Sequence, residues 1–218
     1  MKIKWYGMAA FLLVSEEGVR VIADPYEAGA YDGRIGYSEI TDEADIVTVS
    51  HDHGDHNFVS GVRGNPQVVK GPGVHRVKGM EFKGIAAYHD KTKGSERGPN
   101  TIFSFTMDGM KVCHLGDLGH RLDDQSVAEI GEPDLLLTPV GGRSQIDANE
   151  ATELYQRLKA KVIIPMHYKT EKCGFQFDDV DEFIKGKENV RRLSSCQMEL
   201  RKSDLSSTSQ IVVLEYAP

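Results

Sequence analysis

The feature that most constrains this chain is the run His-Asp-His-Gly-Asp-His at residues 51–56. It directly follows a short apolar stretch, residues 46–49, which is typical of a buried β-strand. Imidazole nitrogens and carboxylate oxygens are ligands for zinc and for divalent iron or manganese. Three imidazoles and a carboxylate in a glycine-containing loop at the end of a strand therefore predict a metal site rather than an inert, solvent-exposed loop.

The spacing within this run separates two pairs of side chains. His51 and His53 are two residues apart, so they can point in the same direction from an extended segment. Asp55 and His56 follow the flexible Gly54 and can face a second centre. The run by itself is therefore compatible with two neighbouring metal ions.

The first half of the chain is predicted to be rich in strands, which are expected at residues 3–6, 10–14, 19–23, 46–49, 101–107 and 111–115. Asp108-Gly109 lies between the last two strands and is a strong signal for a two-residue hairpin. Surface loops are expected over residues 26–40 and near residues 89–100.

The second half alternates between helix and strand. Helices are predicted at residues 123–130, 147–159 and 178–185, and strands at 135–137, 162–164 and 210–215. Asp147 is expected to cap the second helix, because Glu150 follows three residues later. Hairpins early and alternating strands and helices late indicate helices packed outside paired sheets.

The run at residues 51–56 resembles the His-x-His-x-Asp-His signature of the metallo-β-lactamase superfamily. Further landmarks of that superfamily follow in the expected order, namely Asp24 after a hydrophobic run, His89, Asp117 at the end of a strand, and His167. The resemblance covers residues 3–168. It implies an α+β fold, a four-layer αββα sandwich of two mixed β-sheets packed face to face with helices outside. It also implies a single domain over residues 1–218.

The resemblance further implies two divalent metal ions. The expected ligands are His51, His53 and His89 for the first ion, Asp55, His56 and His167 for the second, and Asp117 shared by both. Zinc is the favoured metal, and manganese and iron are the alternatives.

Two residues near the N-terminus bear on the details of this resemblance. Asp24 is expected to accept a hydrogen bond from a ligand imidazole, or else to cap the turn beside Pro25. Residues 5–11 resemble a Gly-His-Ala/Ser-x-Phe segment of the compact branch that includes the ascorbate-6-phosphate lactonase. Met8 stands where that branch usually has histidine, so no role beyond packing is assigned to it.

The mechanism implied by the resemblance is hydrolysis by a metal-bridging hydroxide that Asp55 orients. His120, three residues beyond the shared aspartate, is a candidate general acid, or else a surface residue. Arg143, Lys169 and Arg97 are candidate substrate contacts, although solvated surface charges are the simpler interpretation for each.

Composition narrows the expected substrate. The formal net charge is −7 and no basic cluster exceeds a short pair, which argues against nucleic acid as a partner. We therefore expect a metal-dependent hydrolase of a small-molecule ester, lactone or small phosphodiester. The alternatives are a nuclease or phosphodiesterase acting on nucleic acid, and a catalytically silent metal-binding interaction module. A diiron redox enzyme is disfavoured, because such members carry glutamate where this chain has His53.

The expected location follows from the apolar segments. No stretch approaches the ~20 consecutive apolar residues that span a bilayer. The N-terminal residues lack the layout of a signal peptide. These features predict a cytoplasmic protein with no membrane partner, and they leave its oligomeric state open.

Overall fold

Two β-sheets face each other in the computed structural model, which describes residues 1–218. The strands of the six-stranded sheet lie in the order β13 (Gln197–Glu199), β1 (Lys2–Gly7), β2 (Ala10–Val14), β3 (Arg20–Ala23), β4 (Glu43–Val49) and β5 (Arg63–Lys70). The strands of the eight-stranded sheet lie in the order β12 (Val190–Arg192), β14 (Gln210–Val213), β11 (Val162–Met166), β10 (Leu135–Pro139), β9 (Met110–His114), β8 (Pro99–Met107), β7 (Met80–Tyr88) and β6 (Gly73–Val77). Both sheets mix parallel and antiparallel pairs, as predicted.

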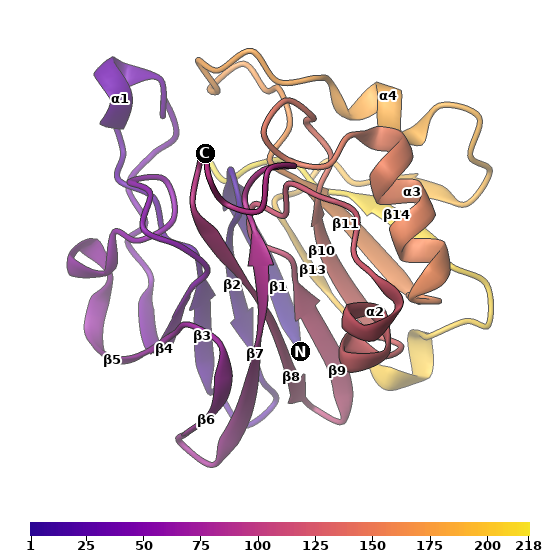
Figure 1. Cartoon of the computed structure of the whole chain (residues 1–218). Helices are drawn as coiled ribbons and strands as arrows, with labels where there is room; N and C mark the ends of the chain where they lie inside the picture. Colours follow the sequence, from indigo (N-terminus) through magenta and orange to yellow (C-terminus); the bar gives the residue numbers. More distant parts are fainter.

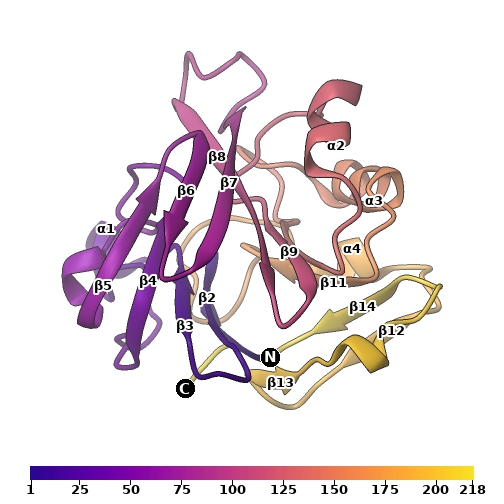
Figure 2. The same ribbon diagram turned by 90° about the horizontal axis from the view of Figure 1, so that it is seen from below.

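The helices are few and short, namely α1 (Ala30–Gly33), α2 (Asp124–Ile130), α3 (Ala148–Arg157) and α4 (Val180–Ile184). Helices α2 and α3 lie on the outer side of the eight-stranded sheet (Figures 1 and 2). No helix has both the length and the apolar composition to cross a bilayer. The predicted αββα sandwich is confirmed, although its helical layers are thin.

The core lies between the sheets because successive side chains of each strand point to opposite faces. On β2, Phe11 and Leu13 join the large core between the two sheets, whereas Ala10 and Leu12 join a smaller cluster on the outer face of the six-stranded sheet. Tyr26, Ile35, Tyr37 and Ile40 cover that outer face. This outer layer is largely irregular and contains the short helix α1, and it makes both faces of β2 apolar.

Local signals placed several elements correctly. Asp108 and Gly109 both adopt positive φ angles, 51° and 70°, as the predicted hairpin requires. The Asp147 carboxylate accepts the backbone N–H of Glu150, and the Glu150 carboxylate accepts that of Asp147, which makes a complete capping box at α3.

Strands β5, β6 and β7, and the short β12 and β13, were not predicted. The side chains of β5 and β6 are mostly exposed, so these strands lack the alternating apolar pattern that marks a half-buried strand. They are held by pairing with β4 and β7, which no local window of sequence reveals.

The strand directions bring the chemically distinctive residues to one edge of the sandwich. Strands β3 and β4 run parallel in one sheet, and β9, β10 and β11 run parallel in the other. Strand β7 is antiparallel to β8, which is antiparallel to β9, so β7 and β9 share a direction. The segments that follow β3, β4, β7, β9 and β11 therefore begin at neighbouring carboxyl ends.

Candidate metal centre

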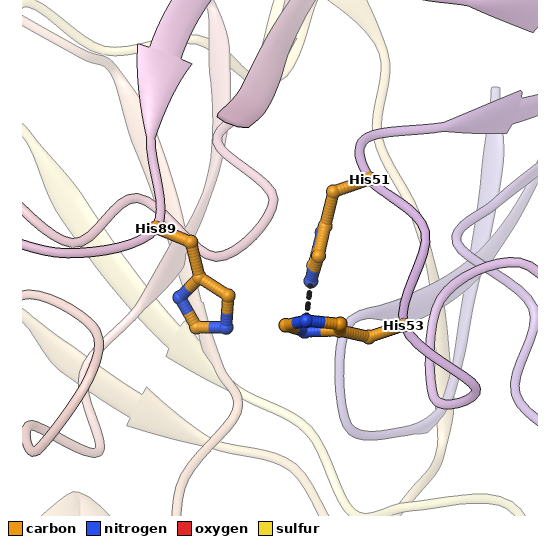
Figure 3. A group of neighbouring side chains, drawn as sticks. All are labelled: His51, His53 and His89. Atoms are coloured by element: carbon orange, nitrogen blue, oxygen red, sulfur yellow. Dashed lines mark hydrogen bonds between the residues drawn. The ribbon is translucent and has the colours of Figure 1, made fainter. Parts of the chain in front are cut away.

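Two groups of potential ligands lie next to each other at this edge. The first consists of His51, His53 and His89, and the second of Asp55, His56, Asp117 and His167. Within each group the ligand atoms lie within 4.8 Å of one another. Figure 3 shows the first group, in which His89 approaches the two histidines of the β4 loop from a separate segment. The structure thus brings together every residue that the resemblance predicted as a metal ligand.

Asp117 lies between the two groups. Its Oδ2 atom is 3.2 Å from Nε2 of His89 and 3.3 Å from Nε2 of His56. Its Oδ1 atom is 3.3 Å from Nε2 of His167. One carboxylate therefore contacts imidazoles of both groups.

The residues of the second group are almost fully buried at the base of the site. Asp55 Oδ2 is 3.3 Å from His56 Nε2 and 3.4 Å from His167 Nε2. The two imidazole rings stack with their planes 7° apart and their centroids separated by 5.3 Å. Two imidazole nitrogens and the oxygens of two carboxylates thus face one another away from bulk water.

Several buried polar atoms of the second group lack a hydrogen-bond partner, which bears on whether this group fits a cation. His56 Nε2, His167 Nε2 and Asp117 Oδ1 are buried and have no hydrogen-bond partner. A buried polar atom left unsatisfied costs about 1–3 kcal/mol, so three such atoms in one place are expensive unless a ligand satisfies them. Imidazole nitrogens and carboxylate oxygens are both ligands of divalent cations, and the residues present therefore fit such a cation.

The electrostatics of the second group favour positive charge. Burial would lower the pKa of His56, but the adjacent Asp117 and Asp55 carboxylates raise it well above its usual value. Burial would raise the pKa values of Asp55 and Asp117, but the facing imidazoles hold both well below their usual range. Both carboxylates are therefore ionised at neutral pH, which suits them to hold a cation.

A buried aspartate fixes the orientation of two imidazoles. Asp24 Oδ2 accepts from His56 Nδ1 at 2.8 Å and from the Ser50 hydroxyl at 2.5 Å. The Ser50 Oγ atom is in turn 2.9 Å from His51 Nδ1. These contacts favour protons on both Nδ1 atoms, which directs the Nε2 atoms of His56 and His51 toward the candidate centre, where His51 Nε2 lies 3.0 Å from His53 Nδ1. Burial also lowers the pKa of His51 to about 3, which keeps its imidazole neutral.

Comparison with known proteins agrees with this geometry. The family described as Beta-lactamase superfamily domain matches residues 2–167. A UPF0173 metal-dependent hydrolase of Carboxydothermus hydrogenoformans is 33% identical over 200 residues, which cover 78% of this chain and 85% of the relative. A similarly described protein of Archaeoglobus fulgidus is 32% identical over 199 residues, covering 78% of this chain and 84% of that protein.

The chain belongs to the metallo-β-lactamase superfamily. A solved structure from Thermotoga maritima, described as a candidate Zn-dependent hydrolase of this superfamily, superimposes with a TM-score of 0.81. It is 39% identical in sequence, and the match covers 99% of both chains. With these relatives, the present chain is a metal-dependent hydrolase of the metallo-β-lactamase fold.

Two side chains beside the metallo-β-lactamase ligand set were not predicted. Gln145 donates from Nε2 to Asp117 Oδ2 at 2.8 Å, and the same nitrogen lies 3.2 Å from His167 Nδ1. Tyr31 donates to Asp55 Oδ1 at 3.2 Å and accepts the Gly54 N–H at 3.0 Å. Neither residue lies in a motif, and each reaches the site from a separate loop, so sequence alone carried no signal for them.

His120 does not lie at the cleft that opens over the metallo-β-lactamase ligands. Its Nε2 accepts the backbone N–H of Tyr88 at 3.1 Å, and its Nδ1 is 2.9 Å from the carbonyl oxygen of Arg121. Both ring nitrogens are therefore occupied by main-chain partners. The general-acid prediction is corrected accordingly: His120 ties the segment after Asp117 to the end of β7, because local spacing did not specify the direction of its ring.

Of the three candidate substrate contacts, two line the cleft and one does not. The Lys169 ammonium donates to the carbonyl oxygens of Cys173 and Phe175, so it braces a loop and does not line the cleft. Arg97 and Arg143 do line the cleft. The prediction for Lys169 is thus corrected, whereas those for the two arginines stay predictions.

Met8 contributes to the centre through its backbone. Its thioether is buried in the outer cluster of the six-stranded sheet, as expected for packing. Its carbonyl oxygen accepts the backbone N–H of His167 at 3.1 Å and the indole N–H of Trp5 at the same distance. The backbone carbonyl of Met8 therefore helps to position His167, although the Met8 side chain is apolar. The resemblance to the lactonase branch stays a prediction.

Above the ligands, the surface is hollowed into a cleft of about 860 Å³. Acidic and imidazole groups form part of its lining, including Asp55, His53, His89, Asp117 and His167. Three arginines and an aromatic wall form other parts, namely Arg34, Arg97, Arg143, Tyr31, Phe175 and Phe177. The ligand groups thus face a space large enough for a small molecule.

Proposed function

We propose that this chain is a dinuclear hydrolase of a small-molecule ester, lactone or phosphodiester. The first ion would be held by the group of His51, His53 and His89, the second by Asp55, His56 and His167, and Asp117 would be shared. The observation that carries the proposal is the position of Asp117, whose Oδ2 lies 3.2 Å from His89 and 3.3 Å from His56.

Two bound cations would supply a hydroxide nucleophile near neutral pH and stabilise the negative charge that develops during hydrolysis. Zinc is the favoured metal for this set of nitrogen and oxygen ligands, and manganese and iron are alternatives that availability in the cell decides.

The side chains of the protein hold this centre rigid. Asp24 and Ser50 keep protons on the Nδ1 atoms of His56 and His51, so that the opposite nitrogens can bind metal. Tyr31 binds one oxygen of Asp55, which leaves the other facing His56 and His167. Each of these contacts removes freedom that metal binding would otherwise have to restrict.

The cleft supports a small substrate. A space of about 860 Å³ lies within the range of small-molecule sites, and it opens directly onto His53, Asp55 and Asp117. The alternatives considered from sequence, a nuclease, a silent binding module and a diiron redox enzyme, have no specific feature of this site in their favour.

Replacing Asp117 with asparagine tests the proposal. Asparagine has nearly the same shape but lacks the charge that faces both groups, so we expect metal content to fall from two equivalents to one or fewer. Hydrolysis of bis-p-nitrophenyl phosphate and of a simple lactone should fall at least a hundredfold. Metal analysis by mass spectrometry and initial rates provide the measurements.

Asp52→Asn is the matched control for that experiment. Asp52 belongs to the same loop, but its carboxylate pairs with Lys70 at the surface and joins neither ligand group. We expect this variant to keep metal and activity. Full retention of both by Asp117→Asn would overturn the proposed centre.

A further inference from the structure

Three arginines of the cleft have no carboxylate partner. The Arg143 guanidinium donates to the neutral side chain of Gln176 at 2.9 Å. The Arg34 guanidinium lies 5.8 Å from the centre of the Phe175 ring, and that of Arg97 forms no ion pair. The positive charge of all three is therefore not neutralised by the protein.

This arrangement is unusual within this chain. Most of its other arginines form ion pairs with acidic side chains, namely Arg20, Arg76, Arg121, Arg157, Arg192 and Arg201. The formal net charge is −7, so acidic partners are abundant. Three unpaired guanidinium groups around one cleft thus concentrate positive charge on a protein that is negative overall.

The acidic groups of the cleft do not cancel these cations. Asp55 and Asp117 face imidazoles of the candidate metal centre. Asp90 accepts four backbone N–H groups of its own loop, from Thr92, Gly94, Glu96 and Arg97. Only the exposed Glu96 remains as a free carboxylate in the lining.

An aromatic wall adjoins two of the arginines. The Phe175 and Phe177 rings are 5.5 Å apart, and Tyr31 meets Phe175 edge to face, also at 5.5 Å. Phe177 in turn packs on His167 at 4.8 Å, so the wall reaches the candidate metal centre. Tyr31 is 43% exposed and both phenylalanines are partly exposed, which leaves apolar surface facing the cleft.

From these observations we propose that the substrate is a small molecule with an oxyanion, a carboxylate or a phosphate, attached to an apolar body. Arg143 and Arg34, which contact Gln176 and Phe175 respectively, bind the oxyanion, and the aromatic wall contacts the apolar body. Guanidinium groups suit this role because they present several N–H donors to oxyanions. This inference rests on the proposed hydrolase function and specifies its substrate.

The test measures binding to the full-length, metal-loaded protein by calorimetry, with four probes that are not hydrolysed. Phenylphosphonate and benzoate carry both features, methylphosphonate lacks the apolar body, and benzyl alcohol lacks the anion. We expect benzyl alcohol and methylphosphonate to bind at least tenfold more weakly than the better of the other two. The relative affinities of phenylphosphonate and benzoate distinguish phosphate from carboxylate as the natural group.

Variants assign the binding to the named residues. Arg143→Gln and Arg34→Gln should each weaken binding of the favoured anion by about tenfold, the usual loss for a charge-assisted hydrogen bond. Phe175→Leu should weaken binding of the aryl anion but not of methylphosphonate. Arg191→Gln is the matched control, because Arg191 is unpaired and exposed on β12, away from the cleft.

Unchanged affinity in both arginine variants would overturn the inference, as would equal binding of benzyl alcohol and the aryl anions. Loss of all anion binding in Asp117→Asn, with normal affinity in the arginine variants, would also overturn it, since metal alone would then hold the anion. Failure of hydrolysis with arginine-dependent anion binding intact would instead contradict the proposed function and leave the binding site standing.

Discussion

At the scale of single residues, Tyr31 determines which oxygen of Asp55 faces the imidazoles. Its hydroxyl donates to Oδ1, and Oδ2 lies near His56 and His167. Tyr31 itself adopts a left-handed conformation with φ of 55°, which costs about 1 kcal/mol or more for a non-glycine residue. The fold thus keeps a strained tyrosine where its hydroxyl can orient a candidate ligand.

Tyr31→Phe removes only this hydroxyl. We expect the affinity for the second metal equivalent to fall about tenfold, because Asp55 loses the hydrogen bond that orients it. The expected effect on turnover is a lower kcat at nearly constant KM. Titration against a chromophoric chelator measures the affinity. Tyr88→Phe, an exposed tyrosine with no hydroxyl contact, should behave as the parent protein, and identical affinities in the two variants would refute the role of Tyr31.

His56 makes metal binding depend on pH. Burial opposes its protonation, but Asp117 and Asp55 raise its pKa well above the usual value of about 6.5, so the metal-free protein carries an imidazolium at neutral pH. Metal binding must expel this proton. Apparent affinity should therefore rise with pH, by up to tenfold per unit, from near neutrality up to the raised pKa, and level off above it.

The same proton has the opposite effect on the metal-free protein. Because the pKa of His56 is higher in the folded than in the unfolded protein, its protonation stabilises the folded, metal-free protein at pH values below the unfolded pKa. This stabilisation is lost as pH rises through the folded pKa. Calorimetry of metal binding in buffers with different heats of ionisation should report the release of about one proton. A metal affinity that stays constant across this range would contradict the assignment.

At the scale of elements, the loop between β7 and β8 is organised by one carboxylate. Asp90 accepts the backbone N–H groups of Thr92, Gly94, Glu96 and Arg97 at 2.7–3.1 Å. Burial opposes ionisation, yet these donors hold the pKa of Asp90 well below its usual range. The loop is therefore ordered from a residue directly after His89, and it carries Arg97 into the cleft.

Asp90→Ala should free this loop without removing a candidate ligand. We expect hydrogen exchange of the Thr92, Gly94, Glu96 and Arg97 amides to accelerate more than tenfold, because their acceptor is lost. In the parent protein the same amides should keep their full protection above about pH 4 and lose it as pH falls further, through the depressed pKa of Asp90. Ser95→Ala, exposed in the same loop, is the control, and unchanged exchange in Asp90→Ala would refute this account.

At the scale of the whole molecule, the candidate centre joins the two sheets. His51, His53, Asp55 and His56 follow β4 of the six-stranded sheet. His89, Asp117 and His167 follow strands of the eight-stranded sheet. Metal bound at both groups would therefore hold the carboxyl ends of the two sheets together.

We propose that residues 1–218 unfold as one domain that metal stabilises. Metal at 100 times its Kd should add about 2.7 kcal/mol to the free energy of unfolding, so a chelator should lower the Tm of a single transition. Trp5, the one tryptophan, lies in β1 of the six-stranded sheet and packs on Tyr168, which follows β11 of the eight-stranded sheet, with ring centroids 5.1 Å apart. Its fluorescence therefore reports on the packing of both sheets. Two separate transitions, or a Tm insensitive to chelator, would contradict this proposal.

The sequence alone was sufficient to identify the candidate ligands and the class of fold. The run at residues 51–56 and the residues His89, Asp117 and His167 were identified through their resemblance to the ligand landmarks of the superfamily. In the structure they follow β4, β7, β9 and β11, whose carboxyl ends meet at one edge, although β7 itself was not predicted. The hairpin at Asp108-Gly109 and the cap at Asp147 were also predictable, because their hydrogen bonds and dihedral angles depend on residues a few positions away.

Only the tertiary structure decided the rest. Strands β5 and β6 are held by pairing rather than by their own apolar pattern. Tyr31 and Gln145 reach the centre, and Ser50 reaches Asp24, through contacts that no local spacing encodes. His120 and Lys169 are near candidate ligands in sequence, yet backbone partners turn their side chains away. The physical reason is the same in each case: a side chain points toward the partners that satisfy it, and folding brings those partners from distant parts of the chain.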